Sequence, residues 1–253
     1  MTPPRLSIVV PIKDEEDNIR PLVEATRAGL GELYDQCEII FVDDGSTDRS
    51  LARIKEVAAE DTHVRWLAFE RNCGQSAALD AGFKAARGEL VAMMDGDLQN
   101  DPADLPRMVE MIEAGQCDCV CGIRQKRHDS WLRKVSSRIG NATRNWLTHE
   151  SIRDVGCSLR VFRRELLADL KMFKGMHRFL PTLLRLEGAR IEEIPVSHRP
   201  RTRGKTKYGV WNRLFRGLRD IFAVRWMQSR RLDYRIKESS DKPEGVEGTR
   251  ARV

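Results

Sequence analysis

Long apolar runs are missing from this chain of 253 residues. No uninterrupted apolar stretch approaches the length of a membrane-spanning helix, about 18 residues, so we expect no transmembrane helix. The first residues do not have the pattern of a secretory signal peptide either, because a short apolar run after Arg5 leads directly into the acidic residues 14–16. With 41% hydrophobic and 32% charged residues, the composition is typical of a globular domain.

Cysteine pairs of the type Cys-x-x-Cys are also missing. Cys117, Cys119 and Cys121 alternate within an apolar run, which predicts one face of a strand and not the Cys-x-x-Cys spacing of a metal site. A chain of this length needs no disulfide framework, so we predict small buried side chains in a reducing compartment. His177 and His198 are interpreted as polar packing residues and not as ligands.

Glycine-rich phosphate-binding motifs do not occur. The sequence has neither Gly-x-Gly-x-x-Gly nor Gly-Lys-Ser, which excludes a dinucleotide fingerprint and a P-loop. Instead, predicted strands alternate with helices of ten or more residues, and this alternation predicts βαβ units and an α/β fold with a mostly parallel sheet.

The predicted elements follow from the apolar patterns. We expect strands over residues 6–12, 37–42, 64–69, 90–94, 117–122, 155–162 and 190–196. We expect helices that begin in the acidic residues 14–18, that follow a cap at Ser46 or Thr47, and that cover residues 76–86, 102–113 and 177–186.

Acidic residues follow three of the predicted strands. They are Asp14 and Glu15, Asp43 and Asp44, and Asp95 and Asp97. The carboxyl ends of parallel strands share one edge of a sheet, where open α/β folds bind ligands, so we expect these acids to lie together. Asp95 and Asp97 repel each other unless a cation neutralises them, and Mg2+ or Mn2+ prefers oxygen ligands. The sequence therefore predicts a metal–diphosphate site; the alternative is a simple acidic loop.

Positive charge gathers in the second half, although the net charge is only +6. Residues 198–219 contain no acid and carry the cations Arg199, Arg201, Arg203, Lys205, Lys207, Arg213, Arg216 and Arg219. Arginine forks bind phosphate bidentately, whereas the alternative is a solvated basic face. Residues 230–253 are polar and charged and predict a disordered tail.

A basic, amphipathic helix is predicted over residues 210–229, after a catalytic domain over residues 1–209. Its apolar residues recur at helical spacing, at Trp211, Leu214, Phe215, Leu218, Ile221 and Phe222. Such a helix either lies in a membrane interface or packs on the domain, and the sequence leaves both open.

Taken in order, these motifs resemble those of the family 2 glycosyltransferases with a GT-A fold. The matching segments are residues 10–15, 42–48, 72–74 and 95–99. Residues 122–124, Arg133 with Ser137, and residues 201–208 resemble the dolichol- and polyprenyl-phosphate sugar transferases, of which dolichol-phosphate mannosyltransferase is the namesake. The resemblance covers about residues 5–210. It departs at Asp14, where the family commonly has Asn.

The resemblance implies a role for each matching residue. The nucleotide would be held by Pro11, Glu15, Asp43, Asp44, Gly74 and Gln75. Metal and diphosphate would be held by Asp95 and Asp97, with Gln99 close by. Phosphates of donor or acceptor would be held by Arg124, Arg133, Ser137, Arg201 and Lys207. The catalytic candidates are Asp95, Asp97, Arg124 and Arg201.

The resemblance also implies the reaction, an inverting and metal-dependent hexosyl transfer from GDP-mannose or a UDP-sugar to dolichyl or undecaprenyl phosphate. A phosphate monoester is anionic at neutral pH because its second pKa is about 6, so such an acceptor needs cations to hold it and no strong base. The cofactor would be Mg2+ or Mn2+. Two alternatives stay open: a soluble family 2 transferase that acts on a sugar or protein hydroxyl, and a non-catalytic basic module that binds lipid or nucleic acid.

The expected location follows from the same resemblance. Many relatives continue into transmembrane helices and this chain stops short of them. We therefore expect a peripheral enzyme at the cytoplasmic face of a membrane, or one that uses a small membrane subunit, with no nucleic-acid partner.

Overall fold

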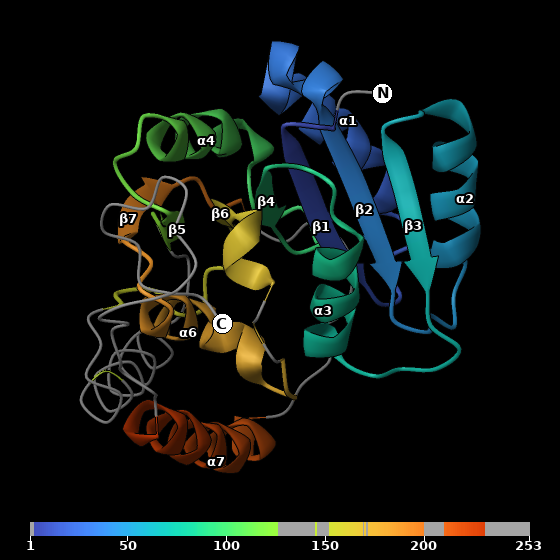
Figure 1. Ribbon diagram of the computed structural model, residues 1–253. Helices are drawn as coiled ribbons and strands as arrows, with labels where there is room; N and C mark the ends of the chain where they lie inside the picture. The colour runs from blue at the N-terminus through green and yellow to red at the C-terminus, as the bar shows by residue number, and fades with distance from the viewer. Residues whose placement is uncertain are drawn as a thin grey trace, which may run out of the picture.

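Seven strands form one mixed sheet in the order β3-β2-β1-β4-β6-β5-β7 (Figure 1). The computed structural model describes residues 3–125, 145, 152–168, 170, 172–199 and 210–230, with the backbone alone for 210–218. The strands are β1 (Leu6–Ile12), β2 (Cys37–Asp43), β3 (Val64–Ala68), β4 (Leu90–Met93), β5 (Cys119–Arg124), β6 (Arg160–Arg163) and β7 (Ile191–Val196). Only β6 runs antiparallel to its neighbours β4 and β5, so the predicted α/β fold with a mostly parallel sheet is confirmed.

Helices cover both faces of this sheet. They are α1 (Ile19–Leu30), α2 (Ser50–Glu60), α3 (Gln75–Ala85), α4 (Leu105–Glu113), α6 (Leu180–Leu186) and α7 (Val210–Ser229). Short 3-10 helices are η1 (Gly31–Gln36), η2 (Pro102–Asp104), η3 (Arg164–Leu167) and η4 (Met176–Arg178). In Figure 1, α3 lies in front of the sheet and α1 lies behind it.

The central strand β1 is buried on both faces because its side chains alternate between two cores. Leu6 and Ile8 belong to the core that contains α1, α2 and α4. Val9 belongs to the core that contains α3 and α6. This double burial explains why β1 reads as a continuous apolar run.

Two predicted helix starts are wrong. The first helix begins at Ile19, so the preceding acids form a loop and none lies in its first turn. Helix α2 begins at Ser50, whose backbone N–H donates to Asp48 Oδ1 at 2.9 Å. Ser46 and Thr47, the predicted caps, contact Asp14 instead: Asp14 N donates to Ser46 Oγ at 2.9 Å, and Thr47 N donates to Asp14 Oδ1 at 2.7 Å.

Two predicted strands are displaced. The strand expected over 155–162 is confined to β6, because Asp154 closes a turn before it, with Cys157 N donating to the Asp154 carbonyl at 3.2 Å. The strand expected from Cys117 begins at Cys119. Cys119 and Cys121 share a face, with sulfurs 3.8 Å apart, but Cys117 is buried in the opposite core. All six cysteines are free thiols, as predicted.

A buried carboxylate, Asp61, joins α1, η1 and the start of β3. It accepts hydrogen bonds from Tyr34 Oη, from Arg27 Nη2 at 2.6 Å and from His63 N at 3.0 Å. Burial by itself raises the pKa of Asp61, but these hydrogen bonds outweigh it and lower the pKa from 3.8 to about 2. A folded-state pKa below the unfolded one gives stability that is present above about pH 4 and is lost as the pH falls toward 2.

Asp61→Asn is therefore expected to destabilise the fold by about 2 kcal/mol near neutral pH, which lowers the melting temperature by about 5 °C. The difference from wild type should shrink as the pH falls from about 4 toward 2, as thermal melts across that range would show. Glu60→Gln is the matched control, because the Glu60–Arg20 pair nearby is exposed on both sides. A difference that stayed constant with pH would contradict the assigned pKa.

Candidate active site at the carboxyl edge of the sheet

Three acidic loops lie at one edge of the sheet. Strand β1 is flanked by β2 and β4, and all three are parallel, so their carboxyl ends point the same way. The acids after these strands therefore share one edge, as the sequence predicted.

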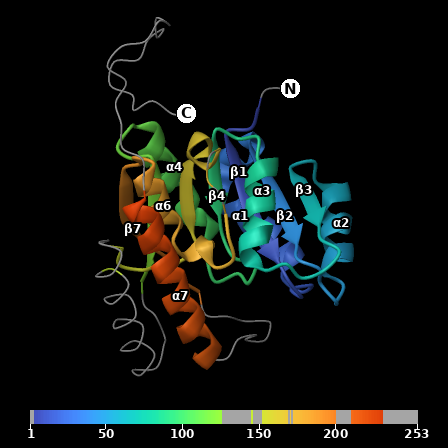
Figure 2. The same ribbon diagram turned by 60° about the horizontal axis from the view of Figure 1, so that its bottom comes forward.

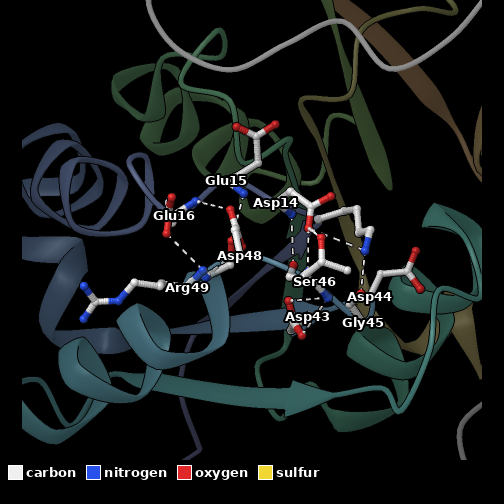
Figure 3. Close-up of polar contacts among 12 residues, drawn as sticks. Asp14, Glu15, Glu16, Asp43, Asp44, Gly45, Ser46, Asp48 and Arg49 are labelled. Atoms are coloured by element: carbon white, nitrogen blue, oxygen red, sulfur yellow. Dashed lines mark hydrogen bonds and ion pairs between the residues drawn. The ribbon is translucent and has the colours of Figure 1, made fainter.

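The loops after β1 and β2 are joined by short polar contacts (Figure 3). Asp14 has a left-handed φ of 48° and accepts the Thr47 N–H, so it braces the neighbouring loop. Glu15 N donates to Ser50 Oγ at 2.8 Å, and the Glu15 carboxylate accepts from Asn18 Nδ2 at 2.6 Å. Asp14, the departure from the family pattern, thus has a structural partner in this chain.

Asp43 and Asp44 are both buried, at 2% and 4% exposure, and both accept backbone hydrogen bonds. Asp43 accepts from Ser46 N at 3.2 Å and closes its own turn. Asp44 reaches the loop after β3, where it accepts from Cys73 N at 2.6 Å and from Gly74 N at 2.9 Å. The Asp44 carboxylate therefore holds the loop that the sequence assigned to the nucleotide.

Gln75 connects that loop to the acids after β4. It is the first residue of α3, and its Nε2 donates to Asp95 Oδ1 at 2.8 Å. Gly74, the residue before it, has a φ of 94°, which favours glycine. The structure thus brings Gly74, Gln75 and Asp95 together, although they come from two different loops.

Asp95, the first of the two acids after β4, has a raised pKa. Burial raises the pKa of Asp95, the charge of Asp97 raises it further, and hydrogen bonds from Ser158 and Gln75 oppose both effects. Asp97 Oδ1 accepts the Gln99 backbone N–H at 3.1 Å, and Arg199 N donates to the Gln99 carbonyl at 2.9 Å. A cation beside the pair would relieve the repulsion that raises the Asp95 pKa.

The oxygen donors at this edge fit a hard divalent ion that shares its coordination with substrate. Within the described part of the chain, no group of three or more His, Cys, Asp or Glu side chains could hold a metal ion. Mg2+ is commonly held by one or two carboxylates and takes its other ligands from water and phosphate oxygens. Asp95 and Asp97 suit that arrangement.

Arg124, the last residue of β5, forms an ion pair that the sequence did not predict. Its Nε and Nη2 donate to the two carboxylate oxygens of Asp154, both at 2.8 Å. Gly156 makes room for the pair, since a Cβ there would lie 2.6 Å from Arg124 Nη2. The Arg124 charge also lowers the pKa of Asp95, which connects the pair to the acidic edge.

The remaining predicted residues divide into two groups. Pro11 lies within β1, opposite Val42 of β2, at the same edge. The predicted phosphate ligands Arg133, Ser137, Arg201 and Lys207 lie outside the described residues, as does the predicted tail beyond residue 230.

The family model for glycosyl transferase family 2 matches residues 7–171, which include all three acidic loops. The chain belongs to glycosyltransferase family 2. Two bacterial relatives of this family 2 chain span most of it. Dodecaprenyl-phosphate galacturonate synthase from Rhizobium johnstonii is 41% identical over 223 residues, 87% of this chain and 66% of the relative. Undecaprenyl-phosphate 4-deoxy-4-formamido-L-arabinose transferase from Edwardsiella ictaluri is 38% identical over 206 residues, which are 81% of this chain and 63% of that relative. The chain thus spans slightly less than two thirds of these relatives.

Solved structures with low sequence identity share the fold of this family 2 chain. Glucosyl-3-phosphoglycerate synthase from Mycobacterium tuberculosis, in complex with Mn2+, UDP and phosphoglyceric acid, has a TM-score of 0.65 at 20% identity, over 91% of this chain and 80% of that one. A mannosyltransferase from Pyrobaculum calidifontis, in complex with GDP-Man and Mn2+, has a TM-score of 0.63 at 18% identity. The match covers 92% of this chain and 66% of that one. The predicted GT-A fold is confirmed.

Sequence reasoning missed several polar residues near the site of this family 2 chain. Asp154 holds Arg124, and Ser158 accepts from Asn100 Nδ2 at 2.7 Å. Ser158 also contributes to the pKa of Asp95. Asp154 and Ser158 lie far along the chain from their partners and in no apolar pattern, so nothing in the local sequence signals them.

Proposed function

We propose that this chain transfers a sugar from a nucleotide-sugar to a polyprenyl phosphate. The main support for this proposal is the hydrogen bond from Gln75 to Asp95 at the carboxyl edge of the sheet. It connects the loop after β3 to the two acids after β4, Asp95 and Asp97. The acceptor class is supported by the relatives at about 40% identity, whose names specify dodecaprenyl and undecaprenyl phosphate.

In this proposal each part of the edge has its own task. Asp95 and Asp97 would hold Mg2+ or Mn2+, which would neutralise the departing nucleoside diphosphate. Gln75 orients Asp95, and Asp44 holds the backbone of the loop before α3. The acceptor phosphate is already an anion, so the chain has to hold it in line with the anomeric carbon and need not deprotonate it. Such in-line attack inverts that carbon.

The proposal does not fix which sugar is transferred. The family resemblance implied GDP-mannose or a UDP-sugar without selecting between them, and the relatives' names specify galacturonate and a formamido-arabinose. We therefore propose a hexose or pentose donor and treat mannosyl transfer as one arm of the test.

Labelled nucleotide-sugars incubated with the protein, Mn2+ and a short-chain prenyl phosphate test this function. Label that enters the organic phase and is released by mild acid would support it. Label in a water-soluble glycan or in protein would support the alternative transferase that acts on a hydroxyl group. If no nucleoside diphosphate bound, but nucleic acid or lipid did, the non-catalytic basic module would replace both.

A second part of the proposal places α7 at the membrane surface. Ile221 and Val224 are buried and pack against Phe179 and Leu183. Phe222 and Trp226 point away from this contact, with 67% and 64% of their surfaces exposed. The exposed residues beside these aromatic rings are Arg219, Arg225, Ser229 and Arg230. Both interpretations of the helix are thus supported, each by a different face.

The position of α7 suits such contact. It lies toward the end of the molecule at which β2 and β3 end (Figure 1), and it runs along one side of the domain (Figure 2). No helix in the described part of the chain is long and apolar enough to cross a membrane. Aromatic rings between arginines suit the headgroup region of an anionic bilayer.

The double variant Phe222→Ser/Trp226→Ser is expected to weaken binding to phosphatidylglycerol vesicles about tenfold or more, because two apolar rings are withheld from the interface. Co-sedimentation measures this, and turnover of a soluble short-chain acceptor should not change. Trp66→Ser is the matched control, since Trp66 is also exposed, at 41%, but lies on β3. If both variants lost vesicle binding equally, α7 would not be the docking face.

A further inference from the structure

A hydrogen bond connects helix α3, which begins with Gln75, to the short helix η4. Ser76 Oγ lies 2.7 Å from His177 Nδ1, although the two residues are 101 positions apart in the sequence. The Gly175 backbone N–H donates to the same Ser76 oxygen at 3.0 Å. Because the hydroxyl accepts from Gly175, its own hydrogen is available for the imidazole Nδ1.

His177 is held in place from the sheet. Arg160 of β6, which is only 2% exposed, donates through Nη1 to the His177 carbonyl at 2.9 Å and through Nη2 to the Val155 carbonyl at 3.0 Å. Burial lowers the pKa of His177 to about 3, helped by the charges of Arg178 and Arg160. The imidazole is therefore neutral at physiological pH, and its Nδ1 can accept.

The first turn of α3 needs support from other elements. Its N-cap is Gly74, which has no side chain with which to cap the helix. The carboxylate of Asp44 holds the backbone N–H groups of Cys73 and Gly74 on one side. Ser76, the second residue of α3, is held by His177 on the other. Between these two supports lies Gln75, whose amide reaches Asp95 at 2.8 Å.

We propose that His177 is a positioning residue of the donor site: its Nδ1 accepts the Ser76 hydroxyl hydrogen and so holds the first turn of α3 where Gln75 meets Asp95. The inference rests on the proposed function, in which Asp95 contacts metal and diphosphate. It goes beyond the interpretation of His177 as a polar packing residue, because it gives that packing a task in the donor site.

Two substitutions at His177 separate a directed hydrogen bond from simple packing. In His177→Asn, the side-chain oxygen can occupy the position of Nδ1, so the acceptor for Ser76 is retained. In His177→Gln, the polar end reaches the position of Nε2, and the acceptor at Nδ1 is lost. The two variants remove the same ring and differ in where the acceptor lies.

The readout is the Kd for UDP and for GDP in the presence of Mn2+, measured by calorimetry without any acceptor. His177→Gln and Ser76→Ala are each expected to raise the Kd of the nucleotide that binds by about tenfold, the value of one lost hydrogen bond. His177→Asn should stay within about twofold of wild type. Because both substitutions break the Ser76–His177 bond, and Ser76→Ala also removes the acceptor of Gly175 N–H, the double variant Ser76→Ala/His177→Gln should bind no worse than Ser76→Ala alone.

The outcomes distinguish this inference from the proposed function. Equal losses in His177→Asn and His177→Gln, additive losses in the double variant, or an unchanged Kd in Ser76→Ala would each overturn the positioning role alone. A wild-type protein that binds neither nucleotide with Mn2+ would overturn the inference and the proposed function together. Thermal melts accompany every variant, and if His177→Gln fails to fold, Ser76→Ala decides the question.

Discussion

Asp97→Ala is expected to lower sugar transfer at least about a thousandfold and to remove the metal-dependent part of nucleotide binding. The physical reason is the charge balance after β4. Asp95 and Asp97 follow the same strand, and the charge of Asp97 adds to burial in raising the pKa of Asp95. In the proposed function Asp97 is one of the two carboxylates that would hold the cation, so its loss would remove a ligand and leave the charge of the departing diphosphate less neutralised.

The melting temperature should not fall in Asp97→Ala, because removing one of two repelling carboxylates costs the fold little. Turnover with each nucleotide-sugar and the Kd for UDP or GDP with and without Mn2+ are the measurements. Asp101→Asn is the matched control: this nearby acid pairs with Arg199 at 2.6 Å and lies at the start of η2. If Asp97→Ala turned over at the wild-type rate, the metal assignment would be wrong.

Asp44→Ala is expected to raise the Kd for the donor nucleotide by about tenfold to a hundredfold, the effect of about 1.5–3 kcal/mol per hydrogen bond to a charged group. Its carboxylate accepts the backbone N–H groups of Cys73 and Gly74, and it is almost fully buried. Truncation leaves both N–H groups without this acceptor and frees the loop that leads into Gln75. The affinity for nucleotide therefore falls even though Asp44 itself faces the loop.

The control for Asp44→Ala is Asp80→Asn on α3, where the acid pairs with the exposed Lys84 one turn away. This variant should bind nucleotide as wild type does, because exposed pairs of this kind contribute little. Calorimetry with UDP or GDP and Mn2+ compares the two. Equal affinity in Asp44→Ala and wild type would show that the loop keeps its place without the carboxylate.

Local patterns determined much of this protein. The apolar run before Asp95 predicted a strand buried on both faces, and β4 (Leu90–Met93) is that strand. Acids after successive strands predicted one shared edge, because parallel strands end on the same side of a sheet. Such features depend on neighbours a few residues apart, so their signals lie within a short window of sequence.

Helix starts were less predictable from the same windows. Ser46 and Thr47 are good capping residues by type, yet Asp14 binds both of them across the loop. Helix α2 then begins at Ser50, whose hydroxyl accepts from Glu15 N. A contact between two loops decided where the helix starts, and propensity alone contains no information about that contact.

Only the tertiary structure decided which polar groups meet at and behind the site. Arg124, whose contact with phosphate stays a prediction, pairs with Asp154, 30 residues away in the sequence. His177, predicted to be a polar packing residue, has Ser76 as its partner, 101 residues away in the sequence. Strand β6 is antiparallel to its neighbours, so its first residue, Arg160, lies at the carboxyl end of β4. There Arg160 donates a hydrogen bond to the His177 carbonyl of η4. Such pairings depend on how distant segments close on each other, and polar residues in loops carry no periodicity that would show them in the sequence.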